Sequence, residues 1–211
     1  MKQIFILYAI VFCSIAAMAQ QQAGKAYGSQ FSVKAGYNIA RVTGSAPDFK
    51  PSSKNGFMVA ASFAPASRNG FGFKTELVFS RQGFGFNAGG KTNTIQSDYI
   101  YLPQFTTFTI AKKVQLQLGG QVGYLLRSNE TKPAEEKTGI TEAMNRLDYG
   151  AAGGIEIFPF KGIIIGGRYN MSLGNSFKVP AAGSVINPLP FNPSDVKSRN
   201  AVINFYLGYR F

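Results

Sequence analysis

Apolar and polar residues alternate strictly along several stretches of this chain. The clearest stretch is 201–211, where one set of alternate positions is wholly apolar: Ala201, Ile203, Phe205, Leu207, Tyr209 and Phe211. The opposite set includes Asn204, Gly208 and Arg210. A period of two over that length predicts a β-strand whose two faces meet different surroundings.

The same alternation recurs along the chain and predicts further strands. The segment 98–110 is also strand-like, although its alternation is ambiguous and Pro103 interrupts it. Because proline has no N–H to donate, we expect Pro103 to mark a bulge or a local break in strand pairing. With 201–211, the pattern predicts eight strands, the others lying at 31–39, 57–63, 71–80, 98–110, 114–124, 147–157 and 163–173.

The two faces of these strands differ in a way that indicates their environment. The aromatic-rich face suits lipid, whereas the other face is rich in glycine and carries polar and charged side chains. In hydrocarbon every backbone group needs a partner, so the strands must close on themselves. The sequence therefore predicts an all-β fold, an eight-stranded antiparallel up-and-down transmembrane β-barrel. Its polar face carries Lys34, Glu76, Gln117, Asp148, Glu156, Arg168 and Arg210.

The lengths of the connections support a barrel. Long and short linkers alternate, as the long outer loops and short periplasmic turns of transmembrane barrels do. With both chain ends on the inner side, this series predicts four long outer loops and three short inner turns. The linkers are 41–56, 65–70, 82–97, 111–113, 126–146, 159–162 and 174–199.

The beginning of the chain predicts export. Lys2 precedes an apolar run over 4–19, which ends in the small-x-small pattern Ala17-Met18-Ala19. An N-terminal membrane anchor is the alternative, but the run is short for one. We expect a signal peptide over 1–19, a short segment over 20–30 and a barrel domain over 31–211, located in the outer membrane.

Six short motifs follow one another along the mature chain, and none of them contains a catalytic residue. They are FSVKAGYN at 31–38, YIYLP at 99–103, GGQVGYL at 119–125, DYGAAGG at 148–154, RYNMSL at 168–173 and LGYRF at 207–211. On these motifs the mature chain resembles the PorT-like outer-membrane β-barrel proteins over nearly its whole length. The resemblance implies an outer-membrane barrel. The family's namesake takes part in type IX protein secretion, so an accessory role there is one of the alternatives.

Composition argues against an enzyme. The chain has no histidine, and its single cysteine, Cys13, lies in the predicted signal peptide. Histidine is a frequent general base and metal ligand, and thiolates bind soft metals. We therefore expect no catalytic residue, cofactor or metal site. Without Lys2, 21 basic residues stand against 10 acidic ones. For an exported protein, this balance favours outer-membrane lipids and lipopolysaccharide as partners over nucleic acid.

The charged residues of the polar face are the main candidate site. An eight-stranded barrel is only wide enough for side chains to fill it, so we expect these charges to pair and plug the lumen. A charged lumen that selects a solute is the alternative. Asp148 and Glu156 lie roughly 26 Å apart along one strand, too far to act as a catalytic pair. The predicted charge network comprises Lys34, Glu76, Asp148, Glu156, Arg168 and Arg210.

The end of the chain offers a second candidate. Tyr209 and Phe211 resemble the terminal aromatic signal that the barrel-assembly machinery recognises during biogenesis. The leading functional hypothesis is a non-enzymatic barrel that acts in envelope structure or in surface interaction through long outer loops. The alternatives are a small-solute channel or transporter, a type IX secretion component, and an exported soluble barrel with an apolar ligand inside.

Overall fold

The computed structural model describes residues 28–43, 51–67, 70–88, 91–131, 138–178 and 198–211. The predicted signal peptide over 1–19, and most of the predicted segment over 20–30, lie outside these residues. Within the described ranges, no helix is long and apolar enough to cross a membrane.

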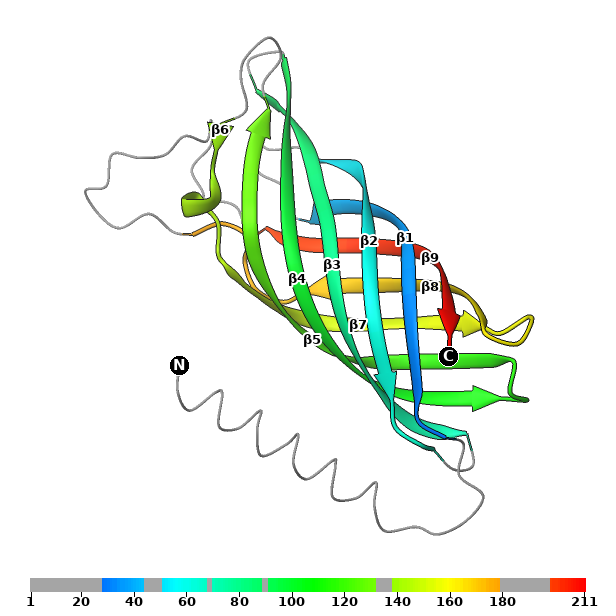
Figure 1. Ribbon diagram of the computed structural model, residues 1–211. Coiled ribbons are helices and arrows are strands. Elements are labelled where there is room, and N and C mark those ends of the chain that lie inside the picture. The colour runs from blue at the N-terminus through cyan, green and yellow to red at the C-terminus, as the bar shows by residue number, and fades with distance from the viewer. Residues whose placement is uncertain (1–27, 44–50, 68–69, 89–90, 132–137, 179–197) are drawn as a thin grey trace, which may run out of the picture.

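Eight antiparallel strands close into a barrel, which confirms the predicted fold (Figure 1). Each long strand pairs with its neighbours in the chain, and β1 closes the ring on β9. A two-residue strand, β6 (Thr138–Gly139), and a 3₁₀ turn, η1 (Thr141–Ala143), lie between β5 and β7. The barrel strands are β1 (Gln30–Thr43), β2 (Ser52–Ala64), β3 (Phe71–Ala88), β4 (Lys91–Ile110), β5 (Val114–Thr131), β7 (Leu147–Ile157), β8 (Ile163–Ser172) and β9 (Arg199–Arg210).

The alternation in sequence becomes an alternation between outside and inside. On β9, Phe205 and Leu207 are 56% and 63% exposed. Tyr206, which lies between them, and Asn204, which precedes them, are each 3% exposed. The exposed side chains form an apolar band around the barrel, which includes Phe31, Leu118, Tyr149 and Ile165 on other strands. Such a band is stable against hydrocarbon and would be costly in water.

The predicted long loop over 82–97 is wrong. β3 continues to Ala88 and β4 begins at Lys91, and the two strands pair up to their tips. Figure 1 shows β3, β4 and β5 rising beyond the other strands at the end away from the C terminus. We call this extension, residues 83–88, 91–97 and 127–131, the protrusion.

The protrusion reverses the polarity of the barrel wall. In β3, the inward side chains change from Lys74 and Glu76 to Phe84 and Phe86, all of them buried. Over the same distance the outward positions change from apolar residues to Gly83, Gly85 and Asn87. An apolar interior with a polar exterior is the arrangement of a water-soluble sheet. The strands therefore leave the membrane at this level.

Two β-bulges mark the level at which the polarity changes. One lies in β2 between Ser53 and Phe57. The other lies in β5, where Asp98 pairs with Arg127 and Tyr99 with Leu125, so that Leu126 is the extra residue. A bulge bends and twists a strand, which lets the protrusion change direction relative to the barrel.

The other predicted linkers are partly correct. The short turns at 65–70 and 111–113 are as predicted, and 159–162 begins one residue earlier. The predicted loops at 41–56, 126–146 and 174–199 are too long at one or both ends, because the flanking strands extend to Thr43, Ser52, Thr131 and Arg199. The longer strands pair the backbone groups of these residues with a neighbouring strand.

Pro103 produces a break in pairing and no bulge. β3 and β4 pair at Thr75–Gln104 and again at Val78–Tyr101, in the same register, with no pair between them. The missing N–H of proline accounts for the interruption. Outside the barrel at this point, Thr75 Oγ1 donates a hydrogen bond to Gln104 Oε1 at 2.7 Å, which pairs two polar groups on the lipid face.

Candidate functional site: a filled lumen

The inner half of the lumen holds five buried charges from four strands. Lys34 on β1 contacts Glu76 on β3 at 2.5 Å and Glu156 on β7 at 2.6 Å. Arg168 on β8 contacts the other oxygen of Glu76 at 2.7 Å. Lys74 on β3 contacts Glu156 at 2.9 Å and Glu76 at 3.7 Å. We call Lys34, Lys74, Glu76, Glu156 and Arg168 the charge cluster.

Both carboxylates of the charge cluster join cations from opposite walls of the barrel. Each of the five side chains is at most 5% exposed. Buried charges are stable only when partners and hydrogen bonds offset the lost hydration. Here the three cations exceed the two carboxylates by one charge, and the Nε of Arg168 has no hydrogen-bond partner among the described residues.

Aromatic side chains complete the charge cluster. Tyr206 donates a hydrogen bond from its hydroxyl to Glu156 at 3.0 Å and accepts one from Gln117 at 2.8 Å. The guanidinium of Arg168 lies 5.2 Å from the ring centre of Phe105 and 5.8 Å from that of Tyr206. Arginine is attracted to aromatic faces, so these rings stabilise the excess positive charge.

Inward glycines make room for the tyrosine rings. A Cβ on Gly166 would collide with the ring of Tyr206, and a Cβ on Gly123 would collide with the ring of Tyr101. Each ring therefore lies flat over a neighbouring strand where another residue would have placed a side chain. At these two positions the glycine lets a tyrosine ring fill the lumen.

A layer of uncharged side chains, joined by hydrogen bonds, lies on the outer side of the charge cluster; we call it the amide layer. Asn204 on β9 bridges Asn38 on β1 and Asn170 on β8, and Asn38 donates to Ser80 Oγ at 2.9 Å. These four side chains come from β3, β1, β9 and β8, and the hydrogen bond between Asn38 and Ser80 crosses β2. The layer ties β3, β1, β9 and β8 together through side chains as well as backbone.

Asp148 belongs to a separate group of side chains, which also lies on the outer side of the charge cluster. Its Oδ2 accepts hydrogen bonds from Tyr101 Oη and Ser172 Oγ, both at 2.7 Å. The ring of Tyr101 stacks on that of Tyr99 with centres 5.3 Å apart. Asp148 is therefore held by the neutral donors Tyr101 and Ser172, apart from the charge cluster.

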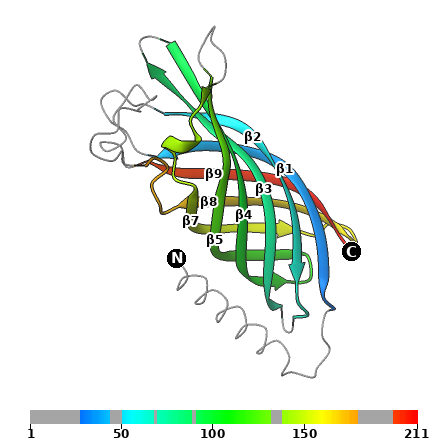
Figure 2. The same ribbon diagram turned by 60° about the vertical axis from the view of Figure 1, so that its left-hand side comes forward.

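An apolar cap closes the outer end of the described lumen. Phe84 packs edge-on against Phe177, with ring centres 6.1 Å apart. Figure 2 shows η1 and β6 lying beside the protrusion that supplies part of this cap. The cap also buries two polar pairs, Ser97–Ser128 at 2.8 Å and Asn93–Glu130 at 2.9 Å. Its apolar members are Phe84, Phe86, Ile95, Leu125, Ile140, Met144 and Phe177.

A small cavity lies between these layers. A cavity of about 10 Å³ lies between Arg168, Gln82, Gln121 and Tyr101. That is roughly the smallest volume that holds one water molecule. Within the described residues, the lumen is thus blocked by a charged layer, an amide layer and an apolar cap.

Sequence comparison assigns the family. The model of the outer membrane protein beta-barrel domain family matches residues 18–178, more than half of the chain. The chain belongs to this family. With the closed ring of amphipathic strands, the match places the protein in the outer membrane, surrounded by its lipids. No functionally curated protein matches the sequence.

Solved structures of outer-membrane proteins are similar to this chain. Ail, the attachment invasion locus protein of Yersinia pestis, in complex with the heparin analogue sucrose octasulfate, is 16% identical, with a TM-score of 0.50 over 88% of this chain and 100% of Ail. Neisserial surface protein A is 15% identical, with a TM-score of 0.49 over 88% and 100% of the two chains. OprG from Pseudomonas aeruginosa is 12% identical, with a TM-score of 0.44 over 87% and 96%. The likeness to Ail, at 16% identity, concerns the fold alone.

The structure brings together four of the six residues proposed as a lumen charge network. Lys34, Glu76, Glu156 and Arg168 meet, whereas Asp148 lies with tyrosines in the outer half. Arg210 lies at the inner end, where its guanidinium is 4.4 Å from the ring centre of Phe158 and bonds Gln30 at 3.3 Å.

Sequence reasoning missed Lys74, Tyr206 and Phe105 as parts of this layer. Lys74 is two residues before Glu76 and shares its face, so the strand alternation could have identified it. Tyr206 occupies the polar face of the most regular strand and could have been found in the same way. Phe105 lies in the segment 98–110, whose alternation is ambiguous. Nothing in that segment indicates that this aromatic side chain faces the lumen.

The two residues proposed as an assembly signal lie at the inner rim of the apolar band. Tyr209 and Phe211 are 46% and 74% exposed, and their rings meet edge-on with centres 5.2 Å apart. The backbone N–H of Phe211 donates to the carbonyl oxygen of Phe31 on β1 at 2.9 Å. Both aromatic side chains therefore stand on the outside of the seam at which β9 closes the barrel on β1.

Proposed function

We propose that this protein is a non-enzymatic barrel with a permanently filled lumen, and that it acts through the surface at its outer end. The observation that carries this proposal is the charge cluster, in which four strands hold five buried charges in mutual contact. A conducting path would have to separate these charges and hydrate each one. The surrounding amide layer and apolar cap leave little space for that water.

The protrusion is the part of the described structure best placed for surface interaction. It extends three strands beyond the apolar band, with polar residues such as Asn87, Thr92 and Gln96 on its outside. Its apolar inner face is covered by Ile140 and Met144, which flank η1, and by Phe177, whereas outward side chains such as Thr92 are exposed. Binding surfaces are commonly carried on such loops and tips above a rigid scaffold. A role in envelope structure or adhesion fits this arrangement.

Conductance measurements test the proposal against the channel alternative. Purified protein is inserted into planar lipid bilayers, with a general porin as the positive control, and swelling of liposomes is followed in sugar solutions. We expect no steady open-channel current and no swelling above that of protein-free liposomes. Steady currents of porin size, or sugar entry, would show that the lumen opens and would refute the filled barrel.

A PorT-like role in type IX secretion is a second, finer proposal. It is supported by the ordered motifs at 31–38, 99–103, 119–125, 148–154, 168–173 and 207–211. Deletion of the gene should then retain a type IX cargo inside the cell. Normal cargo secretion in the deletion strain would eliminate this role without affecting the filled-barrel proposal.

The exposed pair Tyr209 and Phe211 supports a proposed contact with the barrel-assembly machinery during biogenesis. Both aromatic rings lie on the lipid side of the closing strand, where an assembly factor could reach them before the barrel inserts.

A further inference from the structure

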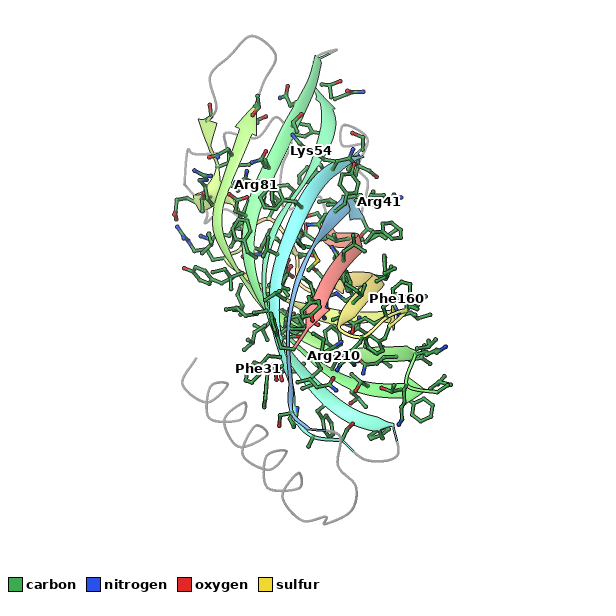
Figure 3. All side chains as sticks on the ribbon, turned by 45° about the vertical axis from the view of Figure 1, so that its right-hand side comes forward. Phe31, Arg41, Lys54, Arg81, Phe160 and Arg210 are labelled. Carbon is green, nitrogen blue, oxygen red and sulfur yellow. The ribbon has the colours of Figure 1, made fainter. Side chains whose placement is uncertain are left out.

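Arginines stand at the outer edge of the apolar band. Along each of β1, β3 and β5, the first charged side chain on the outward face is an arginine: Arg41 after Ile39, Arg81 after Phe79 and Arg127 after Leu126. Arg199 begins β9 at the same end, and Arg146 immediately precedes β7. We call Arg41, Arg81, Arg127, Arg146 and Arg199 the arginine collar. Figure 3 shows Arg41 and Arg81 near the protrusion, far from Phe31 and Arg210 at the opposite end.

Arg81 and Arg127 are held side by side by one carboxylate. Arg81 donates from Nε and Nη2 to the two oxygens of Asp98, at 2.7 and 2.9 Å. Arg127 donates from Nη2 to the same Asp98 at 3.2 Å. Asp98 is 8% exposed, whereas the side chain of Arg127 is 60% exposed. The guanidinium of Arg81 also lies 5.3 Å from the ring centre of Phe57.

This group keeps one positive charge and presents it outward. The three side chains come from neighbouring strands in one register row, in which Arg81 pairs with Asp98 and Asp98 with Arg127. Since adjacent strands lie about 4.8 Å apart, the two arginine backbones are separated by roughly 10 Å. The carboxylate of Asp98 holds both guanidinium groups in place but neutralises only one of their two positive charges.

The remaining arginines extend the positive charge around the barrel. Arg41 and Arg199 lie on adjacent strands, where Arg41 pairs with Ala201 and Thr43 with Arg199. Arg146 contacts Glu142 at 2.5 Å, and this guanidinium lowers the pKa of that exposed carboxyl. Among the residues that the structure describes, the collar therefore sets five arginines against two carboxylates in contact with it, Asp98 and Glu142.

We infer that the arginine collar binds the phosphate groups of lipopolysaccharide in the outer leaflet. Guanidinium groups bind phosphate through paired hydrogen bonds, and arginine is preferred over lysine for that geometry. The collar lies where lipid headgroups meet the barrel, at the border between the apolar band and the polar protrusion. It lies opposite the chain ends, so it faces the leaflet built of lipopolysaccharide. This inference does not depend on the filled lumen or on a protein partner.

Binding of lipid A by the purified, folded protein tests the inference. Fluorescent lipid A is titrated into the protein in a zwitterionic detergent, and its anisotropy gives the dissociation constant. The double variant Arg81→Gln/Arg127→Gln should bind about 30-fold more weakly, from about 1 kcal/mol for each basic residue at a lipid surface. The wild type should bind enzymatically dephosphorylated lipid A no more tightly than the variant binds phosphorylated lipid A.

A matched control removes the same charge at the other end of the barrel. Lys113 and Lys161 are exposed residues of the inner turns, and Lys113→Gln/Lys161→Gln should change the dissociation constant less than twofold. Heat-modifiable migration in detergent gels verifies that each variant is folded. If Arg81→Gln/Arg127→Gln does not assemble, Arg41→Gln/Arg199→Gln replaces it with the same expected direction.

Three results would overturn the inference. Equal affinity of the wild type and the arginine variants would show that the collar takes no part. Equal binding of dephosphorylated lipid A would remove phosphate from the recognition. Equal competition by phosphatidylglycerol vesicles of matched phosphate content would mean that the collar binds any anionic lipid surface and does not select lipopolysaccharide.

Discussion

Replacing Glu76 by glutamine perturbs the charge cluster at its centre. Glu76 contacts Lys34 at 2.5 Å, Arg168 at 2.7 Å and Lys74 at 3.7 Å. Glutamine keeps the size of the side chain but removes its charge. Glu156 would then be the one carboxylate left in the charge cluster opposite three buried cations.

The expected cost is large because the partners stay buried. Removing one partner of a buried ion pair typically costs about 3–5 kcal/mol, most of it from the charge left without compensation. The cavity beside Arg168 admits about one water, so hydration can relieve little of this cost. We expect Glu76→Gln to lower the free energy of unfolding by about 3–5 kcal/mol. Adding Lys34→Met should recover roughly 0.5–3 kcal/mol, since it removes an uncompensated cation.

Urea unfolding in lipid vesicles, followed by heat-modifiable migration and tyrosine fluorescence, measures both changes. Glu142→Gln is the matched control, because it makes the same substitution in an ion pair whose carboxylate side chain is 81% exposed. The control should leave the unfolding midpoint unchanged. The reasoning fails if Glu76→Gln is no more destabilising than Glu142→Gln, or if Lys34→Met adds to the loss.

Three further predictions concern other parts of the barrel. Phe205→Arg, at a 56% exposed position in the middle of β9, should cost about 2–4 kcal/mol if the side chain faces lipid, as measured by urea unfolding in vesicles. Ala111 and Lys112 both have positive φ, 50° and 59°, in the β4–β5 turn, so Ala111→Asn/Lys112→Gly should stabilise the barrel by about 1 kcal/mol. Deletion of Phe211 should reduce the amount of assembled barrel in membranes more than it reduces total synthesis, as judged by fractionation and immunoblotting.

Each of these predictions has a control of opposite or neutral outcome. Thr94→Arg places the same charge on the outside of the protrusion, beyond the apolar band, and should cost little. Gly70 has a φ of 79°, so Gly70→Ala should destabilise the β2–β3 turn. Phe160 is as exposed as Phe211, at 74%, and Phe160→Ala should leave assembly unchanged. Equal effects of Phe160→Ala and the Phe211 deletion would count against a terminal signal.

The strands could be predicted because lipid imposes a contrast between the two faces. Outward positions are mostly apolar, whereas inward positions face other side chains in a polar lumen. That contrast is visible in β9, from Ala201 to Phe211, without any knowledge of its neighbours. In β4 the contrast is weak, because Tyr99, Tyr101 and Phe105 face inward and the outside carries Gln104.

The protrusion could not be predicted from the same rule. Its strands continue the alternation but exchange the apolar and polar sides, with Phe84, Phe86 and Ile95 inside. A prediction that assigns every apolar position to lipid ends each strand where the apolar side chains change faces, and it therefore places a loop there. The exchange itself is the informative signal, since it marks the level at which the wall passes from hydrocarbon into water.

The members of the charge cluster could be predicted only as inward residues. Their contacts depend on strand register and on the tilt of the barrel, which determine which rows of different strands meet. Register brings Glu76 of β3 to Arg168 of β8, although 92 residues separate them in the chain. It also leaves Asp148 outside the charge cluster, eight positions from Glu156 along β7.

Labelling of single cysteines on intact cells tests most directly whether the barrel crosses the outer membrane with its protrusion outward. Asn87→Cys places a thiol on the exposed tip of the protrusion, and Lys113→Cys places one in the β4–β5 turn at the opposite end. Since the sequence has no cysteine after Cys13, a membrane-impermeant maleimide then reports one site in each variant. We predict that the Asn87→Cys variant is labelled on intact cells and that the Lys113→Cys variant is labelled only after lysis. Labelling of the Lys113→Cys variant alone on intact cells, or equal labelling of both, would contradict this orientation.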